Sequence, residues 1–420
     1  GINAEYGNQK QYDKQNLDPS DYLLDIDIYS EGFNRYVNNN IKYGAEWLQK
    51  LTLPTIEFDV ASLKIHLKDL KVSDVKMPKV DFIFDIDAMI AKLSNWMISF
   101  DFVFDVQQQT YPYLQDAGTG QLKIQLEANL NMNEEINEEC PYHITLDCRS
   151  FLLNIYDLKV HMESPMSFIY NAVLLAVTKT LKDIFNSYMQ PVLLYSIVEI
   201  GNSGLWGMDL SSSINDTSPY LVDQRYGVVH INKTFLHTSS PGRMVFKQND
   251  SAYVDYDPQL KRLPRRVYAA NFDVFYYLQK EVFQSSADAY MKYKYIQPSG
   301  NNENDSIQKP KLTVLSVEHT GVLWSLETQN SKAQILGQIK TDTYSNRDNA
   351  NVTVFRFWLN KVYKMEGDQA EIERFMEVFN KGIEPLHPSY NNGNAVKLPS
   401  CQHFYFDKNW VMFGCDFEDV

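Results

Sequence analysis

The sequence lacks a long hydrophobic run, which argues against a membrane-spanning helix. Such a helix needs about 18–20 consecutive apolar residues. The strongest candidate, Phe168–Val177, is followed at once by Lys179, Lys182 and Asp183. The chain starts at Gly1 with a polar stretch and shows no signal peptide. We therefore expect a mature form from which a leader has been removed.

Basic residues are also scarce: 39 Lys and Arg stand against 53 Asp and Glu, giving a net charge of −14. Nucleic-acid binding requires clustered basic side chains, so no nucleic-acid partner is expected. The acidic balance also argues against strong attraction to anionic membranes. The densest basic cluster, Lys261–Arg266, is interpreted as a solvated loop. Contact with phosphate headgroups or a partner, or a processing site, are its alternatives.

Catalytic motifs are missing as well. The chain has no Gly-x-Ser-x-Gly elbow, no His-Glu-x-x-His, no phosphate loop and no dinucleotide glycine fingerprint. Its eight histidines include no pair at helical i, i+4 spacing, so no metal site is predicted. Asp81, Asp85 and Asp87 alternate along a predicted strand, which indicates a solvent-facing row rather than a calcium site. We expect neither an enzyme nor a catalytic cofactor.

Cysteine is limited to four residues. Cys401 and Cys415 flank a predicted hairpin at 403–413 and are equidistant from Lys408, which favours a disulfide over two buried thiols. Cys140 and Cys148 can pair only if the chain turns, for example near Pro141. The disulfides point to an oxidising compartment. Five glycosylation sequons agree with a secreted, lumenal or cell-surface glycoprotein, at Asn215, Asn232, Asn249, Asn304 and Asn351.

What the first half contains is alternation of apolar and polar residues. The runs are Leu63–Leu67, Val80–Ile86, Phe100–Val106 and Leu122–Met132, continued by Ile144–Cys148 and Phe151–Met162. Period two over successive runs predicts an antiparallel sheet with one apolar face. Several runs are long for strands, which suits a large and strongly bent sheet.

Two helices are predicted beside this sheet. Apolar residues from Phe33 to Leu51 recur every three or four positions and predict one helix over Ser30–Leu51. Ser164 as N-cap and Pro165 as first residue open a second helix. We expect that helix to bend or break near Pro191.

The second half repeats this order in looser form. Strands are predicted at 226–235, 312–326, 335–343 and 352–362, and helices at 273–290 and 371–382. A repeat at half the chain length predicts two copies of one architecture. The expected domains are a polar arm at 1–20, an N-terminal barrel at 21–200, a linker or central sheet crossing at 201–225, and a C-terminal barrel at 226–420.

Five collinear motifs carry a family resemblance. They are Leu51–Ile56 with Leu63–Val72, Ile144–Cys148 with Leu158–Met162, Tyr226–Phe235, Arg266–Leu278, and Val396–Pro399 with Phe404–Phe417. Over roughly residues 25–418 the chain resembles the bactericidal/permeability-increasing protein family, which includes the lipopolysaccharide-binding, cholesteryl ester transfer and phospholipid transfer proteins. Each motif alone has low specificity, and the resemblance rests on their shared order.

The resemblance implies an α+β, boomerang-shaped tubular lipid-binding fold. Two elongated antiparallel-sheet barrels, each with a long helix, are joined by a central sheet and take lipid acyl chains in apolar pockets. The chain departs from the family in two respects. Residues 165–200 contain no cysteine, so the family's disulfide from a strand to the long helix cannot form. Because the chain is acidic, endotoxin binding and bacterial killing are not carried over.

The expected lipid-lining residues lie on the predicted helices and on strands opposite them. In the first barrel they are Phe33, Val37, Ile41, Leu48, Phe82, Phe84, Phe102, Phe104, Val173, Val177, Leu181 and Ile184. In the second barrel they are Phe275, Leu278, Val282, Phe375 and Phe379. The alternative is that these side chains pack on one another.

The expected function is non-enzymatic binding, and transfer, of phospholipid-like lipids. Burying an acyl chain of about sixteen carbons is worth very roughly 12 kcal/mol relative to water, at ~0.8 kcal/mol per CH₂. The chain gains almost nothing relative to a membrane, so exchange with transient membrane contact needs no catalyst. The alternative is a structural or interaction subunit of a larger assembly, with lipid as filler or absent, tied to a protein partner through residues 1–20.

Overall fold

The computed structural model describes residues 18–136, 142–206, 210–212, 220–248, 251–253, 262–263, 271–293, 309–345, 351–383, 400–405 and 407–417. The chain forms two compact units that mix strands and helices. Unit 1 comprises Gly1–Gly32, Glu134–Thr145 and Asn202–Glu418. Unit 2 comprises Phe33–Asn133 and Leu146–Gly201, with Asp419–Val420. Each unit is described by itself.

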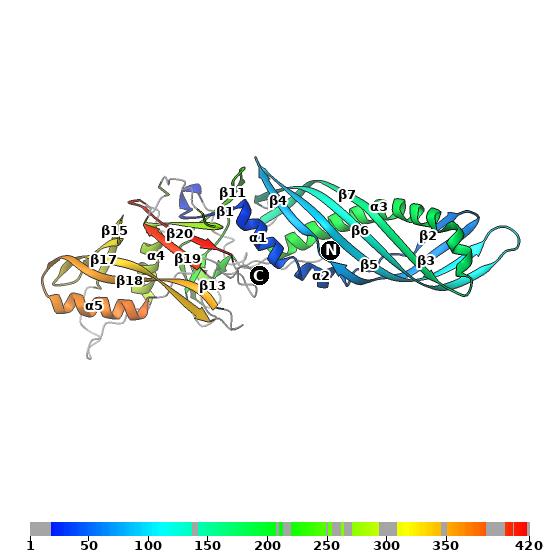
Figure 1. Ribbon diagram of the computed structural model, residues 1–420. Helices are drawn as coiled ribbons and strands as arrows, with labels where there is room; N and C mark the ends of the chain where they lie inside the picture. Colours follow the sequence, from blue (N-terminus) through cyan, green and yellow to red (C-terminus); the bar gives the residue numbers. More distant parts are fainter. Residues whose placement is uncertain are drawn as a thin grey trace. The chain divides into compact units, whose positions relative to one another are not determined.

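Unit 2 is built on one sheet of long strands with the order β2-β3-β5-β6-β7, and β4 pairs with β5 (Figure 1). The strands are β2 (Ile56–Val60), β3 (Leu63–Lys76), β4 (Lys79–Asp85), β5 (Ala88–Gln108), β6 (Gln115–Ile136) and β7 (Ile144–Glu163). The register shifts in β3 against β5, and in β5 against β6 between Leu93 and Trp96. Such irregularities bend and twist strands. The predicted runs of alternation are therefore strands of one curled sheet.

The alternation separates two faces of this sheet. On one face Ile98, Phe100, Leu122 and Ile124 are buried, whereas Asp81, Asp85 and Asp101 on the other face are exposed, and Asp87 is exposed in the turn between β4 and β5. The aspartates thus line the solvent side, as the period of two predicts.

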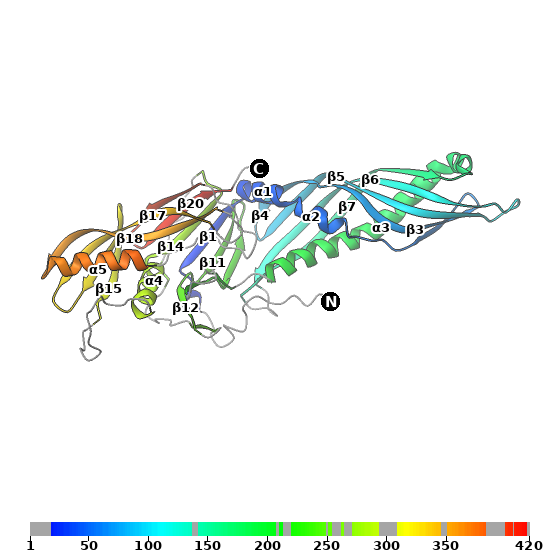
Figure 2. The same cartoon turned by 90° about the horizontal axis from the view of Figure 1, so that it is seen from below.

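Helix α3 (Ser167–Trp206) runs along the buried face of the sheet in both views (Figures 1 and 2). It starts two residues after the predicted position. The Ser164 hydroxyl donates to Asp116 at 2.5 Å and accepts from the Met166 N–H, the bond expected of an N-cap. Of the bend or break expected near Pro191, the break does not occur, and the helix continues through this residue. Pro191 is exposed, so water can bind the carbonyl that it leaves without a donor. Residues 201–206, expected in a linker, complete this helix.

The predicted helix over Ser30–Leu51 is two helices. Helix α1 spans Ser30–Asn40 and α2 spans Tyr43–Leu48. At the junction the Gly44 N–H donates to the Ile41 carbonyl at 2.9 Å, a shorter-range bond than the helical i to i−4 pattern. Leu48, the last residue of α2, is buried.

Unit 1 contains a six-stranded antiparallel sheet with the order β10-β11-β1-β14-β20-β19. The strands are β1 (Leu24–Tyr29), β10 (Val228–Ile231), β11 (Phe235–Ser240), β14 (Val274–Gln279), β19 (Ser400–Tyr405) and β20 (Trp410–Asp416). The strand predicted at 226–235 is therefore a hairpin. The Asn232 side chain forms its turn by accepting from the N–H groups of Thr234 and Phe235.

A second sheet of unit 1 has the order β15-β16-β17-β18 and packs with helices α4 (Lys280–Tyr293) and α5 (Gln369–Gly382). Its strands are β15 (Lys311–Glu318), β16 (Gly321–Glu327), β17 (Lys332–Ser345) and β18 (Asn351–Glu366). Asp368 caps α5 by accepting from the Ala370 N–H. Short strands β8 (Ser211–Ser212), β9 (Tyr220–Asp223), β12 (Met244–Gln248) and β13 (Ser251–Tyr253) form a third sheet, and residues Pro19–Asp21 form a 3₁₀ turn.

One helix prediction was wrong at its start. The stretch 273–290 was expected to be helical throughout, with Phe275, Leu278 and Val282 on one face. Phe275 and Leu278 instead lie on β14, and only Val282 lies on α4. All six residues of β14 are buried because the strand is central and covered on both faces. A strand buried on both faces shows no alternation, so its apolar residues matched a helical spacing by coincidence.

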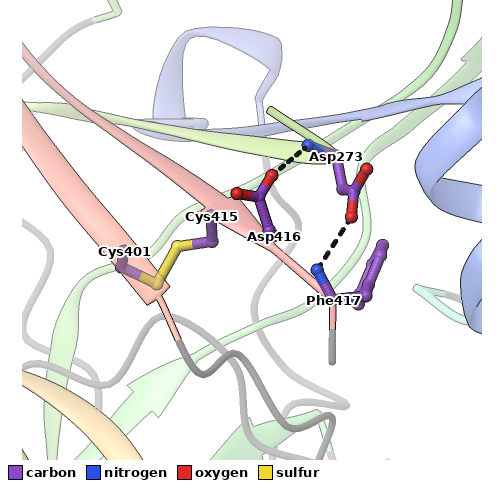
Figure 3. The surroundings of a disulfide bond; sticks show 5 residues. All are labelled: Asp273, Cys401, Cys415, Asp416 and Phe417. Atoms are coloured by element: carbon purple, nitrogen blue, oxygen red, sulfur yellow. Dashed lines mark hydrogen bonds between the residues drawn. A yellow bond between two sulfur atoms is a disulfide. The ribbon is translucent and has the colours of Figure 1, made fainter. Parts of the chain in front are cut away.

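The disulfide between Cys401 and Cys415 is confirmed. The two residues face each other on β19 and β20, with a Cα–Cα distance of 4.2 Å (Figure 3). Next to it, Asp273 donates its N–H to Asp416 and accepts the Phe417 N–H at 2.9 Å, which ties the last strand to the start of β14. The Cys148 thiol is free and donates to the Ser150 carbonyl. Cys140 lies outside the described residues.

Other sequence predictions lie wholly or partly outside the described residues. They include most of the arm at 1–20 and the sequons at Asn215, Asn249 and Asn304. Of the basic cluster 261–266 only Arg262 and Leu263 are described, and Arg262 is half-buried in an ion pair rather than solvated. No helix within the described ranges has both the length and the apolar character to cross a membrane.

Candidate functional site

The candidate site is the apolar interior between α3 and the sheet of unit 2. On α3, Val177, Leu181, Phe185, Met189 and Leu193 recur every four residues, and each is at most 1% exposed. Side chains at this spacing form one ridge along a helix. Because the ridge is slightly inclined to the helix axis, it can follow a twisted sheet over its whole length.

The ridge is fastened to the sheet by a ring contact and by two side-chain hydrogen bonds. The Phe185 ring lies 6.0 Å from that of Phe100 on β5. The Asn186 amide oxygen accepts from the Ile155 N–H, and the Gln190 amide donates to the Phe151 carbonyl at 3.1 Å. Two amide side chains of α3 therefore bind the backbone of β7 and fix the position of the helix.

The opposite wall is shaped by two aromatic residues that face glycines. Phe102 pairs with Gly120 and Phe104 with Gly118 across β5 and β6. A Cβ atom at Gly120 would lie 2.4 Å from the Phe102 ring, and one at Gly118 would lie 3.0 Å from the Phe104 ring. The rings therefore lie over their cross-strand neighbours, where a side chain would otherwise stand.

A third wall is formed by α1 and the edge strand β4. The Phe33 ring packs on Phe82 and Phe84, at centroid distances of 4.9 and 5.6 Å. Asn34 donates to the Phe82 carbonyl at 2.9 Å and accepts from the Phe82 N–H at 2.5 Å. Asn38 makes the same pair with Val80, at 2.7 and 3.0 Å. We call these four bonds the asparagine clamp. It pairs the outer edge of β4, which would otherwise expose its backbone groups.

The predicted lining residues of unit 2 fall into two groups. Six are buried: Leu48, Phe84, Phe102, Phe104, Val177 and Leu181. Phe33, Val37, Ile41, Phe82 and Ile184 are half-buried, and the side chain of Val173 on α3 lies outside the described ones. Phe100, Phe185, Met189 and Leu193 were missed. On α3, the four-residue spacing of Val177 and Leu181 continues to Phe185, Met189 and Leu193 and could have identified these three.

In unit 1 the predicted residues lie in two separate clusters. Phe375 and Phe379 on α5 stack at 5.8 Å, and Phe379 also contacts Tyr290 of α4 and Phe357 of β18. Phe275 instead packs with Tyr277, Trp410 and Met412 in the six-stranded sheet.

The two units differ in what they bury. Among the described residues of unit 2, the buried polar side chains are Ser99 and Ser196, and none is charged. Unit 1 buries several charged side chains, including Asp25, Asp27, Asp223, Arg225 and Arg243. An ion buried away from water needs a partner, and Arg225 binds Asp223 at 2.8 Å. An apolar ligand is therefore better accommodated by the interior of unit 2.

Lys68, His66 and Asp105 lie on the outer face of the unit 2 sheet. There the hydrogen bond from Lys68, and then that from His66, lowers the pKa of Asp105. In unit 1, burial raises the pKa of Glu134 to about 7. Burial and then the charge of Glu134 raise the pKa of Tyr226 to about 12. No group of three or more His, Cys, Asp or Glu in the described parts of the chain is placed to hold a metal ion.

The sequence did not reveal a polar chain in unit 1 that contains the residue types of a catalytic triad. His237 binds Asp27 through Nδ1 at 2.6 Å and lies 3.0 Å from the Ser239 hydroxyl through Nε2. The Ser239 hydroxyl, however, donates to Asp25 at 2.7 Å, and Arg262 binds both oxygens of Asp25. Since Ser239 is 2% exposed and its proton is directed at Asp25, the chain joins β1, β11 and residue 262 rather than presenting a nucleophile.

Comparison with known proteins supports the fold. No protein-family model matches the sequence, and no curated protein sequence matches it significantly. Among solved structures, lipopolysaccharide binding protein is similar with a TM-score of 0.61 and 11% identity, over 95% of this chain and 99% of that one. At this identity the match shows the fold, and it confirms the predicted structural resemblance.

Two further structures give weaker matches. Takeout 1 of Epiphyas postvittana is 13% identical, with a TM-score of 0.29 over 42% of this chain and 89% of that one. P47 from Clostridium botulinum A2 is 8% identical, with a TM-score of 0.25 over 96% of this chain and 99% of that one. At these TM-scores we draw nothing from either protein.

Proposed function

We propose that this protein binds lipid acyl chains in the apolar interior of unit 2 and performs no chemistry on them. The observation that carries the proposal is the buried ridge of α3 facing an apolar sheet wall with no buried charge. An acyl chain gains free energy from apolar contact alone, so such an interior can bind it without polar groups of its own. The likeness to lipopolysaccharide binding protein, whose name states that it binds a lipid, supports this choice.

The proposal has finer parts that follow from the family resemblance. The ligand is phospholipid-like, each unit is an elongated barrel, and Val282, Phe375 and Phe379 line the second lipid site. Lipid is exchanged with membranes by transient contact, and the protein acts as a secreted, lumenal or cell-surface glycoprotein. The disulfide between Cys401 and Cys415 supports an oxidising compartment.

A second candidate function is favoured by a specific observation. Phe100 and Phe185 are both fully buried and contact each other, so side chains already fill this part of the interior. A unit filled in this way suits a structural or interaction subunit. In the lipid-binding alternative, the half-buried residues Phe33, Val37, Ile41 and Ile184 mark where an acyl chain would lie.

Native mass spectrometry of the purified protein, followed by lipid extraction, separates the two functions. One or two phospholipid-sized adducts that are lost on denaturation support lipid binding. A clean protein mass with no lipid in the extract supports the structural subunit.

A matched pair of variants then locates the ligand. Leu181→Trp adds a ring to the fully buried ridge, whereas Leu152→Trp adds the same ring at a residue that is 66% exposed. We expect less bound lipid in the Leu181 variant and unchanged lipid in the Leu152 variant. Overpacking costs about 1–3 kcal/mol, so thermal melts must show that both variants fold. Equal lipid in both folded variants would remove the ligand from this interior.

A further inference from the structure

One end of unit 2 presents aromatic rings to solvent. Tyr111 and Tyr113, in the turn between β5 and β6, are 86% and 68% exposed. Their rings contact each other edge to face at 6.4 Å. The turn is held by bonds from the Gln108 N–H to the Leu114 carbonyl and from the Tyr113 N–H to the Thr110 carbonyl. The two rings are therefore displayed by a closed, hydrogen-bonded turn.

Two other segments meet this turn. The Gln109 N–H donates to the Ser62 carbonyl at 2.8 Å, which joins it to the turn between β2 and β3. The Ser164 hydroxyl donates to Asp116 at 2.5 Å, which joins the start of β6 to the connection into α3. Figures 1 and 2 both show these turns and the start of α3 at the same end of the sheet. We call this end the tip.

The tip has almost no charge. Residues 60–63, 106–115 and 164–178 contain no Asp, Glu, Lys or Arg, although 22% of the chain is charged. Of the charged residues that adjoin these ranges, Asp59 accepts from the Gln109 amide and Asp116 from Ser164, while Lys64 pairs with Glu57, Asp105 with Lys68, and Glu163 with His161. On α3, Leu175 is 89% exposed. In a chain with a net charge of −14, a surface without charge and with exposed apolar groups is suited to a neutral partner.

We propose that the tip docks on the surface of a zwitterionic phospholipid membrane, with Tyr111 and Tyr113 inserted at the headgroup level. A tyrosine ring is apolar at its body and polar at its hydroxyl, and tyrosine is enriched at membrane interfaces for this reason. Lys64, which adjoins the tip, is paired with Glu57, so the tip gains little from anionic lipids, and the acidic chain is repelled by them. The docking surface is separate from the interior ridge of α3, so it does not depend on lipid bound inside unit 2.

Vesicle flotation with pure phosphatidylcholine tests the proposal. We expect the wild-type chain to float, and Tyr111→Ser with Tyr113→Ser to lower the partition coefficient by about tenfold, because two apolar rings leave the interface. The control, Tyr156→Ser with Tyr188→Ser, removes two rings that are 45% and 51% exposed elsewhere in unit 2, and it should float like wild type. Salt should not weaken the binding, and added phosphatidylserine should reduce it.

Each contrary outcome overturns the proposal. It fails if the wild-type chain does not float, if the Tyr111 and Tyr113 variant floats as well as wild type, or if binding requires phosphatidylserine. It also fails if the wild-type chain forms a dimer in the absence of lipid and the Tyr111 and Tyr113 variant does not. The tip would then bind a second copy of the chain rather than a membrane. Lipid extracted from the same variant reports on the interior separately, so tip docking and acyl-chain binding succeed or fail independently.

Discussion

Replacing both residues of the asparagine clamp with alanine should release the edge of β4. Asn34 and Asn38 together make four hydrogen bonds to the backbone of Phe82 and Val80. At a net value of about 0.5–1.5 kcal/mol per bond, and with water replacing part of the loss, the double variant should destabilise this edge by about 2–4 kcal/mol. Each single variant should cost about half of that.

Hydrogen exchange is the most direct assay, because global unfolding of a two-unit chain need not be two-state. A loss of 2 kcal/mol in local stability raises exchange by roughly thirtyfold, since 1.4 kcal/mol corresponds to tenfold. We expect this increase at the amides of Val80 and Phe82, which donate to the two asparagines, and not at amides of β4 that bond to β5.

Two further variants complete the test of the clamp. Asn154→Ala removes an exposed asparagine of β7 with one hydrogen bond to Glu127, and should leave β4 unchanged. Replacing both clamp residues with aspartate retains the acceptors but loses the donors and places carboxylates against carbonyls, so it should destabilise at least as much as alanine. Unchanged exchange at Val80 and Phe82 in the alanine variant would refute the clamp.

Three other predictions concern pH and covalent stability. Glu134 has a folded pKa of about 7, above its ordinary value of 4.5, so its ionisation should cost up to about 3 kcal/mol of stability as pH rises from 4.5 through 7. Glu134→Gln should therefore raise the urea midpoint at pH 8 and match wild type at pH 4. Asp105→Asn should lower the free energy of unfolding by about 1 kcal/mol or less at pH 7, because the pKa of Asp105 is lowered mainly by its hydrogen bond from Lys68. That difference should vanish as acid titration protonates the wild-type carboxyl. Replacing Cys401 and Cys415 with serine should lower the free energy of unfolding by about 3 kcal/mol, given their sequence separation of 14. If the thermal melt of this variant matches that of the reduced wild type, the substitutions act only by removing the disulfide.

The sequence was most informative where one side of a strand meets water. In Phe100–Val106 every second residue is polar or exposed, and this alternation alone identifies β5 and its buried face. The same logic located the hairpin of β19 and β20 and its disulfide, because a symmetric turn fixes which residues are opposite.

Sequence reasoning was less informative where burial is complete or where partners are distant. Strand β14 is covered on both faces and so has no alternation. A bend or break was expected near Pro191, and only the exposure of that position shows why α3 continues through it. No local pattern pairs Asp25 with Ser239, since their contact exists only after β1 joins β11.

The position of β1 in unit 1 has a consequence for biosynthesis. Asp27 precedes its partner His237 by 210 residues, and β1 lies between two strands, β11 and β14, that are both made later. At about 5–20 residues per second, a ribosome needs roughly 10–40 s to reach them. During that interval all the strands of unit 2 have been synthesised and β1 has no neighbour. Its two aspartates keep this waiting strand charged and a poor template for other chains, and they lose contact with water only when residues 235–279 have been made.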